Sequence, residues 1–472
     1  MNFIFILTAI IFVVSRLMNL MQFPPFMDET IYIRWLRIIK QTGHWFLPLR
    51  EFGWAPLTTW ISTLLSYLVK DDLLSLRLTA GLFGGLSLII AYKLAKLLFN
   101  DRRTTILTLL FIILSPFILI HDRLGLRGDS AVTFTALLLL YGLAKRLLKK
   151  QKTAAYLIGL AIALGLLIKS TAWIFPLMTL SAYLVFRPKL FQSDWLGGLL
   201  AGSSLLFYLL TNSLTAFLNK TNVFLVSPDK VASLSKNNFI QLAQWSYQYL
   251  SLPVLLLIFY GAYLSFKKNK KVWLLLTSAI LPVLIFDTLF AKIFFPRYLL
   301  FIAAYSFFFA AFGLTSIFKK LPGYLFFPVL LLIFLPNLIT DTAVIRDIKA
   351  AKLPEIERWQ YVTGWPSGYG LKELSQYLQT DTPDILITEE NNLVRGGLPY
   401  LWPEHSLEII AVGEDNSLTQ EQLTKLKNSP KIYLVLNVAE KLPKQLQGEL
   451  IKKFPRPENK TSLRLYKTTV IK

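Results

Sequence analysis

Hydrophobic runs of bilayer-spanning length recur through the first 340 residues of the chain, separated by short polar loops. A helix of about 20 apolar residues crosses the hydrocarbon core of a membrane. We therefore predict a polytopic α-helical membrane domain with about eleven transmembrane helices. They are expected at residues 3–20, 77–99, 104–120, 130–148, 153–168, 171–186, 195–217, 251–266, 272–290, 298–317 and 321–340.

Two stretches near the N-terminus do not have the pattern of a spanning helix. Residues 57–69 are apolar but too short, which is typical of an interfacial or re-entrant helix. Before them, Ile31, Trp35 and Ile38 recur at helical spacing with a basic stripe on another side. We expect both segments to be interfacial helices on the outer face of the membrane.

The pattern changes after about residue 340, where the apolar runs become short. Four of these runs are typical of strands, at residues 384–390, 407–412, 431–438 and 462–470. Three segments between them are typical of helices, at residues 371–379, 418–428 and 443–454. The sequence thus predicts two domains, a membrane domain at 1–340 and a small soluble α/β domain at 341–472.

A glycine-rich stretch, GWPSGYGLKEL at residues 364–374, invites comparison with a phosphate-binding loop. It lacks the Lys-Ser/Thr pair of a P-loop, and no strand clearly precedes it. The simpler interpretation is a turn in which Ser367 caps the following helix.

Composition and charge agree with a membrane protein. The mean hydropathy is +0.50, and the chain has no cysteine, which excludes disulfides and cysteine-ligated metals. The net charge of +22 does not indicate nucleic-acid binding, because the basic residues form short clusters between apolar runs. The positive-inside rule assigns five such clusters to the cytoplasm. A multi-pass plasma-membrane protein follows, with a cytoplasmic N-terminus and an extracytoplasmic C-terminal domain.

Ionisable side chains at membrane depth are costly, so their positions point to function. In this topology they gather at the outer ends of the helices, where we expect them to surround one outward-facing cavity. The acids are Asp28, Glu29, Asp122 and Asp129, and the bases are Arg123, Arg127, Lys169 and Arg297.

Several of these charged residues also have a purely structural interpretation. Asp28 could cap the surface helix, with Glu29 favouring its positive end. Arginines near helix ends, including Arg16, Arg123 and Arg127, commonly snorkel to the interface, and Arg297 could simply mark the start of a helix.

The ordered set of motifs resembles the GT-C glycosyltransferases, in the branch of protein O-mannosyltransferases and the bacterial aminoarabinose transferase. The similar segments are MDETIY, WAPLTTWISTLLSYLV, RLTAGLFGGLSLIIAYKLAKLLF, HDRLGLRGDSAVTFTALLLLYGLA, LGLLIKSTAWIFPL and FPRYLLFIAA. They extend over residues 1 to about 317.

This resemblance implies transfer of a sugar from a polyprenyl-phosphate donor to a protein, lipid or glycan acceptor, with inversion. Asp28 would be the general base, with Glu29 in support. A divalent cation is a possible cofactor, at Asp28, Glu29 and Asp129. Asp122 and Asp129 would form a second acidic site. The donor phosphate would be bound by Arg297, Tyr298, Lys169, Arg127 and Arg123.

Two other classes of protein also place charges in a helical bundle. A transporter or lipid flippase would favour inverted repeats and broken helices at mid-membrane, which we do not find in the sequence. A non-catalytic envelope assembly protein would use the C-terminal domain for binding, and would tolerate mutation of the carboxylates.

Overall fold

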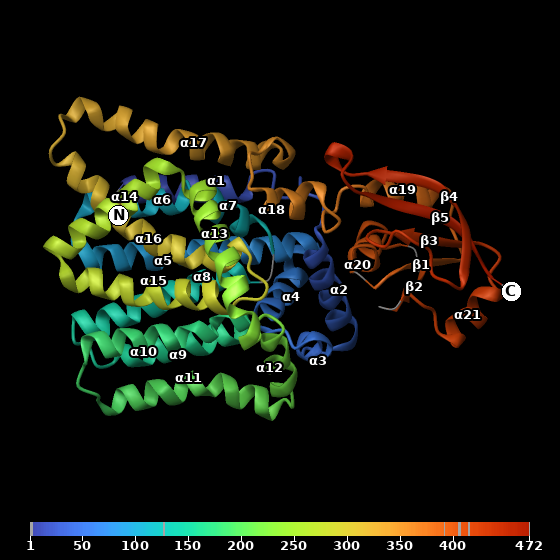
Figure 1. The fold of residues 1–472 in the computed structure, drawn as a ribbon, viewed down its shortest axis with the longest axis horizontal. Coiled ribbons are helices and arrows are strands. Elements are labelled where there is room, and N and C mark those ends of the chain that lie inside the picture. The colour runs from blue at the N-terminus through green and yellow to red at the C-terminus, as the bar shows by residue number, and fades with distance from the viewer. Residues whose placement is uncertain (1–2, 126–127, 391, 405–406, 414–415, 472) are drawn as a thin grey trace. The chain divides into compact units, whose positions relative to one another are not determined.

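The computed structural model describes residues 3–125, 128–390, 392–404, 407–413 and 416–471, which fall into two compact units (Figure 1). The helical unit contains Met1–Leu20, Gly43–Lys70 and Leu74–Arg346. The α/β unit contains Met21–Thr42, Asp71–Leu73 and Asp347–Lys472. The segment with the acidic pair, Met21–Thr42, thus belongs to the α/β unit although it is distant from it in sequence.

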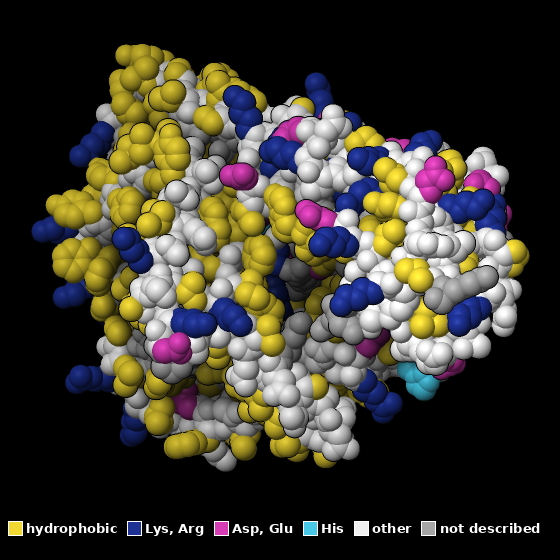
Figure 2. Space-filling view, turned by 45° about the vertical axis from the view of Figure 1, so that its right-hand side comes forward, with side chains coloured by type: hydrophobic (Ala, Val, Ile, Leu, Met, Phe, Trp, Pro, Cys, Tyr) yellow, Lys and Arg dark blue, Asp and Glu magenta, His cyan; other side chains and the backbone are white. Residues whose placement is uncertain are grey.

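The helical unit is built from long apolar helices, and hydrophobic side chains cover much of its visible surface (Figure 2). Its helices are α1 (Phe3–Leu17), α3 (Leu47–Phe52), α4 (Leu57–Val69), α5 (Asp72–Phe99), α6 (Arg102–Ile113), α7 (Pro116–Arg123), α8 (Asp129–Leu143), α9 (Ala154–Ile168), α10 (Ile174–Phe186), α11 (Gln192–Leu210), α12 (Leu214–Asn222), α13 (Val231–Leu250), α14 (Leu252–Lys268), α15 (Lys270–Phe290), α16 (Leu300–Phe318) and α17 (Phe326–Arg346).

The polytopic membrane fold is confirmed, while the number of spans stays a prediction. Within the described residues, six helices are long and apolar enough to cross a membrane, or up to eight if each of two bent pairs is one span. The six are Asp72–Phe99, Asp129–Leu148, Gln192–Leu210, Lys270–Phe290, Pro296–Phe318 and Gly323–Arg346. The expected spans at 3–20, 153–168 and 171–186 coincide with shorter apolar helices. Residues 57–69 form α4, and its place in the membrane stays a prediction.

The two bent pairs break where the sequence interrupts backbone hydrogen bonding. α6 and α7 meet at 58°, and α7 begins with Pro116, which tolerates only a first-turn position. α13 and α14 meet at 106° at Ser251, which has φ 60° and ψ 156° and is followed two residues later by Pro253. Such a backbone conformation is rare for a residue other than glycine.

Glycines let helices approach closely within the helical unit. A Cβ on Gly261 of α14 would lie 1.8 Å from the carbonyl oxygen of Phe309 in α16. A Cβ on Gly159 of α9 would lie 2.1 Å from the carbonyl oxygen of Gly197 in α11. Small residues at these crossings are the usual means of packing helices within a membrane.

The α/β unit contains a sheet whose described strands have the order β2-β1-β3-β5-β4. The strands are β1 (Ile385–Glu389), β2 (Glu408–Val412), β3 (Ile432–Leu436), β4 (Leu446–Pro455) and β5 (Ser462–Val470). β1 pairs in parallel with β2 and β3, and β5 pairs antiparallel with β3 and β4. The small α/β domain is therefore confirmed, as are the four strands expected from the sequence.

Two of the three helices expected in this region form, as α19 (Leu371–Thr380) and α21 (Gln420–Lys427). The third prediction, a helix at 443–454, is wrong, because most of this segment is strand β4. Its helix-favouring composition is overridden by an antiparallel ladder with β5 that runs from Leu446 to Pro455. A further helix, α20 (Asn392–Leu401), was not expected, since it contains two glycines and a proline.

Helix α19 does not begin as predicted either. Its N-cap is Gly370, which has φ 87°, and Ser367 lies three residues earlier in the turn. The Ser367 hydroxyl instead donates to the carbonyl oxygen of Val362 at 3.0 Å.

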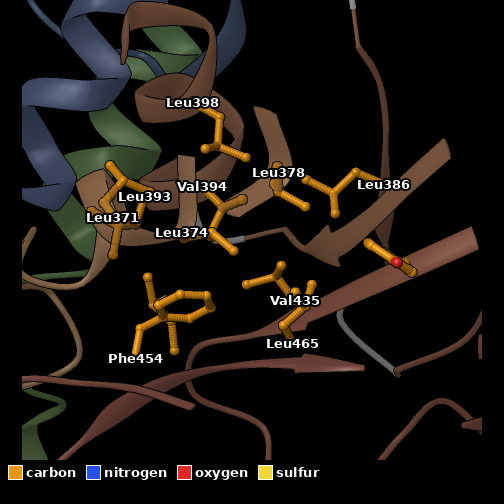
Figure 3. Packing of buried hydrophobic residues seen from close by; sticks show 12 residues of the cluster. Leu371, Leu374, Leu378, Leu386, Leu393, Val394, Leu398, Val435, Phe454 and Leu465 are labelled. Carbon is orange, nitrogen blue, oxygen red and sulfur yellow. The ribbon is translucent and has the colours of Figure 1, made fainter. Parts of the chain in front are cut away.

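One hydrophobic core joins α19 and α20 to the sheet. Figure 3 shows leucines of both helices meeting side chains that project from β1, β3, β4 and β5. The central members are Leu371, Leu374, Leu378, Leu386, Leu393, Val394, Leu398, Val435, Phe454 and Leu465.

Helix α2 (Met27–Thr42), in the same unit, is the helix expected after the first apolar run. It packs against α20 (Figure 1). A Cβ on Gly396 of α20 would lie 2.3 Å from the carbonyl oxygen of Thr30. One side of α2 is therefore covered by protein.

Candidate functional site

The acidic pair lies in the first turn of α2, and both carboxylates are buried. The backbone N–H of Phe26 donates to Glu29 Oε2 at 3.1 Å, and the carbonyl of Phe26 accepts from the N–H of Thr30 at 3.1 Å. Phe26 is thus the N-cap, and Glu29 reaches back to it as in half of a capping box. Asp28 lies inside the helix, so the interpretation of Asp28 as the N-cap does not hold. A burial this deep is unusual for two adjacent carboxylates.

In the helical unit, Lys169 and Asp129 come together from the end of α9 and the start of α8, 40 positions apart. Lys169 is the C-cap of α9 and has an extended backbone, before the short turn η2 (Ser170–Trp173). Asp129 is the first residue of α8, where a carboxylate favours the positive helix end. The Lys169 ammonium forms an ion pair with Asp129 Oδ1, and the Asp129 side chain is buried.

Tyr298 and Arg297 lie beside this ion pair, in the turn η4 (Pro296–Leu299) that precedes α16. Lys169 Nζ is 5.3 Å from the centre of the Tyr298 ring. The Arg297 guanidinium carbon is 5.7 Å from the same ring and 4.2 Å from the ring of Phe295. The structure therefore places Lys169, Arg297 and Tyr298 near one another, with Asp129 paired to Lys169, and their role in binding a phosphate stays a prediction.

A cavity of about 390 Å³ in the helical unit is lined by Lys169 and Tyr298. Its other walls are mainly apolar side chains of α10, α12, α15 and α16, and they also include Asp287 of α15. The sequence prediction missed Asp287, although an acid inside an apolar span was a signal of its own. The cavity combines mainly apolar walls with two ionisable side chains, Lys169 and Asp287, which suits an amphipathic ligand.

Arg123 and Asp122 belong to a second cluster, made of buried charges. Arg16 Nε donates to Asp122 Oδ2 at 3.2 Å, and Ser130 Oγ donates to Asp122 Oδ1 at 2.8 Å. Arg123 Nη1 donates to the carbonyl oxygen of Ser15 at 2.7 Å, near the C-terminal end of α1. The alternative that Arg16 and Arg123 snorkel to the interface is wrong, because both guanidinium groups point into protein.

Two further residues of the helical unit fit this cluster. Arg77 of α5 is fully buried and donates to the carbonyl oxygen of Leu20 at 2.8 Å. Gly84, about two turns after Arg77 in α5, leaves room for Asp122, since a Cβ at Gly84 would lie 2.6 Å from the carboxyl carbon of Asp122. The sequence prediction did not single out either residue.

The remaining sequence-based expectations concern Arg127 and a metal. Arg127 lies outside the described residues. Within the part of the chain that the structure describes, no three His, Asp or Glu side chains converge as metal ligands. The divalent cation at Asp28, Glu29 and Asp129 stays a prediction.

The chain thus combines a bundle of apolar helices, with charged groups at helix ends, and a small α/β region. Residues 54–211 match the family described as dolichyl-phosphate-mannose-protein mannosyltransferase, a segment that includes Asp129 and Lys169. The resemblance to the GT-C glycosyltransferases, in the aminoarabinose transferase-like branch, is confirmed.

Two proteins of similar sequence come from Pseudomonas species. An undecaprenyl phosphate-alpha-4-amino-4-deoxy-L-arabinose arabinosyl transferase of Pseudomonas fluorescens is 28% identical over 173 residues, which is 34% of this chain and 31% of that protein. A Pseudomonas aeruginosa enzyme of the same name is 28% identical over 172 residues, again 34% and 31% of the two chains. The matched segments thus span about a third of the relatives' length.

The fold likeness extends much further than the sequence match. ArnT from Cupriavidus metallidurans in the apo state gives a TM-score of 0.66 at 13% identity, covering 98% of this chain and 97% of that one. The same protein bound to undecaprenyl phosphate gives 0.61, also at 13% identity and with the same coverage. The likeness at this identity concerns the fold.

Proposed function

We propose that this protein is a membrane glycosyltransferase that moves a sugar from a polyprenyl-phosphate donor to an acceptor on the extracytoplasmic face. One observation carries the proposal: the Lys169 ammonium and the Tyr298 ring line an apolar cavity in the helical unit. Apolar walls suit an isoprenoid chain, and a cation suits a phosphate. The fold resembles that of ArnT, which has been solved with undecaprenyl phosphate.

The donor phosphate is proposed to bind beside Tyr298. Lys169 and Arg297 are the two cationic side chains beside this ring, with the Asp129 carboxylate paired to Lys169, and the Tyr298 hydroxyl supplies a hydrogen-bond donor. When the bond between the sugar and the phosphate breaks, negative charge grows on the lipid phosphate, and cations held in place stabilise it. Arg123 is left out of this group because its guanidinium is engaged with carbonyl oxygens of α1.

Asp28 is proposed as the general base. An acceptor hydroxyl is a weak nucleophile, and a carboxylate that accepts its proton during attack on the anomeric carbon speeds the reaction. The acceptor oxygen then bonds to the anomeric carbon while the bond to the phosphate oxygen breaks. A single displacement of this kind inverts the anomeric configuration. Glu29 supports the first turn of α2 through its bond to the Phe26 N–H.

The test is the turnover of Asp28→Asn in nanodiscs with a panel of undecaprenyl-phosphate-linked hexoses and pentoses, with products identified by mass spectrometry. Loss of general-base assistance should slow transfer by about 10²- to 10⁴-fold, with the donor still bound. Glu29→Gln should lose less, because an amide oxygen can still accept from Phe26. Near-normal turnover in Asp28→Asn would refute Asp28 as the base.

The orientation of the chain is part of the same proposal. The basic clusters between the apolar runs support a cytoplasmic N-terminus and an extracytoplasmic α/β unit. Reporter fusions after Lys320 and after Lys472 should then report opposite sides of the membrane. The same side for both fusions would contradict the assigned topology.

A further inference from the structure

Within the α/β unit, the start of α2 rests on the glycine-rich turn at residues 364–370. The backbone N–H of Met27 donates to the carbonyl oxygen of Pro366 at 2.9 Å. A Cβ on Gly368 would lie 2.1 Å from the carbonyl oxygen of Pro25, so the two backbones are in direct contact. The residue before Asp28 is thus hydrogen-bonded to this turn.

Other parts of the α/β unit hold the same end of α2. The Phe26 ring meets the Tyr361 ring edge to face, with 5.2 Å between centroids. Met27 packs against the core formed by α19, α20 and the sheet. Gly396 and Gly397 of α20 let that helix approach Thr30, one residue beyond the acidic pair. The first turn of α2 is therefore fixed from several directions.

One buried arginine, directly after β4, holds the turn at 364–370 in place. Arg456 is 1% exposed. Its Nε donates to the carbonyl oxygen of Ser367 at 3.0 Å, and its Nη2 donates to that of Trp365 at 3.2 Å and to Asn437 Oδ1 at 2.6 Å. Asn437 Nδ2 also donates to the carbonyl oxygen of Trp365, at 3.1 Å. The carbonyl groups of Trp365 and Ser367, on either side of Pro366, are therefore held by hydrogen bonds from Arg456 and Asn437.

The segments around Arg456 are themselves held by hydrogen bonds. Glu389, at the end of β1, accepts from the N–H groups of Asn437 at 2.7 Å and Val438 at 3.0 Å. The Thr461 hydroxyl donates to the carbonyl oxygen of Thr363 at 2.6 Å. Burial lowers the pKa of Arg456 to about 10, so the side chain stays charged at neutral pH. A charged donor in a dry site makes strong hydrogen bonds to neutral carbonyls.

We propose that Arg456 is a positioning residue for Asp28, and that the α/β unit serves to hold the acidic pair in place. This inference rests on the proposed role of Asp28 as the base. Arg456 fixes Ser367 and Trp365, the turn fixes Met27, and Met27 precedes Asp28 in the first turn of α2. A base misplaced by about 1 Å can lose about a hundredfold in rate.

The kinetic test compares Arg456→Met and Arg456→Lys with a matched control, Leu434→Ala. Leu434 is buried in β3 on the opposite face of the sheet, so its truncation destabilises the unit without touching the turn. With the undecaprenyl-phosphate sugar that the wild type uses fastest, Arg456→Met should lower kcat about tenfold or more and leave the donor KM within about twofold. Arg456→Lys should recover part of kcat, because it keeps one charged donor.

A double-mutant cycle separates positioning from general damage. If Arg456 acts through Asp28, adding Arg456→Met to Asp28→Asn should slow the residual transfer by less than about twofold. A full additional loss in the double variant would overturn the proposal, and so would an unchanged kcat in Arg456→Met. If Asp28→Asn is itself near normal, the proposed function fails instead, and the two failures are distinguishable.

Hydrogen exchange gives a readout that does not depend on activity. In the full chain, Arg456→Met and Gly368→Ala should both speed amide exchange in peptides covering residues 24–30. Leu434→Ala should speed exchange mainly in the sheet. Unchanged exchange at 24–30 in both of the first two variants would show that the turn does not hold α2, and would overturn the proposal even in an inactive preparation.

Discussion

An ion pair in the helical unit and one in the α/β unit differ strongly in their exposure to solvent. In the helical unit, Arg16 and Asp122 form an ion pair with side chains only 1% and 3% exposed. In the α/β unit, Lys431 and Asp381 form a pair that is 33% and 39% exposed. An exposed pair competes with water and contributes little, whereas breaking a buried pair leaves an uncompensated charge. The α/β unit also buries charged residues, among them Asp28, Glu29 and Arg456, and the Arg456 side chain donates to acceptors on Ser367, Trp365 and Asn437.

The sharpest test of this contrast is Arg16→Met, for which we expect the largest effect. The change leaves Asp122 buried between α1, α5 and α7 without its main partner. Loss of one member of a buried pair typically costs about 3–5 kcal/mol. Unfolding of the purified protein by SDS titration, followed by tryptophan fluorescence, measures the loss.

The matched control for Arg16→Met is Arg102→Met, in the first turn of α6. Arg102 is exposed, and a surface arginine contributes at most about 1 kcal/mol. Equal losses in the two variants would mean that the Arg16–Asp122 pair is no more important than a surface charge.

A second test concerns helix packing rather than charge. Gly261→Ala places a methyl group against the backbone of α16, where the gap to the Phe309 oxygen is only 1.8 Å. Overpacking of this kind costs typically about 1–3 kcal/mol. Gly202→Ala in α11 is the control, because a Cβ there has nothing within 4 Å. The SDS titration should show a loss for the first variant and none, or a slight gain from helix propensity, for the second.

Much of the fold could be predicted because hydrophobic periodicity is a local property. Strand pairing is not local, and this explains the error at 443–454. That segment has a helix-like composition, and only its ladder to β5 makes it a strand. The same limit explains α20, whose Gly396 and Gly397 disfavour a helix in isolation but permit close approach to α2.

The candidate site was predictable to a similar extent. Charged residues at helix ends indicated Lys169, Asp129 and Arg297, because such residues are costly near lipid. The sequence could not show that Arg16 pairs with Asp122 across 106 positions, or that the acidic segment belongs to the α/β unit. Both facts depend on contacts between distant segments, which no local pattern encodes.

A smaller effect, on the donor KM, is expected when the proposed donor site is altered at Arg297. Arg297→Ala should raise the donor KM about tenfold, equivalent to about 1.4 kcal/mol, and Arg297→Lys should raise it less because a point charge remains. Titration of undecaprenyl-phosphate sugars in nanodiscs measures this difference. Wild-type kinetics in both variants would exclude Arg297 from the donor site.

The smallest expected effect belongs to the exposed pair of the α/β unit. The hydrogen bond from the Lys431 ammonium, with another from the Tyr433 hydroxyl, holds the pKa of the Asp381 carboxyl below its usual range. A carboxyl with a lowered pKa in the folded state stabilises the fold above its unfolded pKa, and loses this contribution as the pH falls through its folded pKa. Because the pair is exposed and screened by water, Asp381→Asn should cost only about 0.2–1 kcal/mol at pH 7.

The difference in stability between wild type and Asp381→Asn should therefore shrink below about pH 4, because the carboxyl is protonated first in the unfolded chain and only at lower pH in the folded state. The chain has no cysteine, so a single Val435→Cys in the core of the α/β unit allows thiol labelling to report its opening in the full protein. Labelling at pH 7 measures the cost of the substitution, and thermal unfolding at pH 7, 5 and 3.5 follows its pH dependence. A cost as large as that of Arg16→Met would show that the two units do not differ in how their ion pairs contribute to stability.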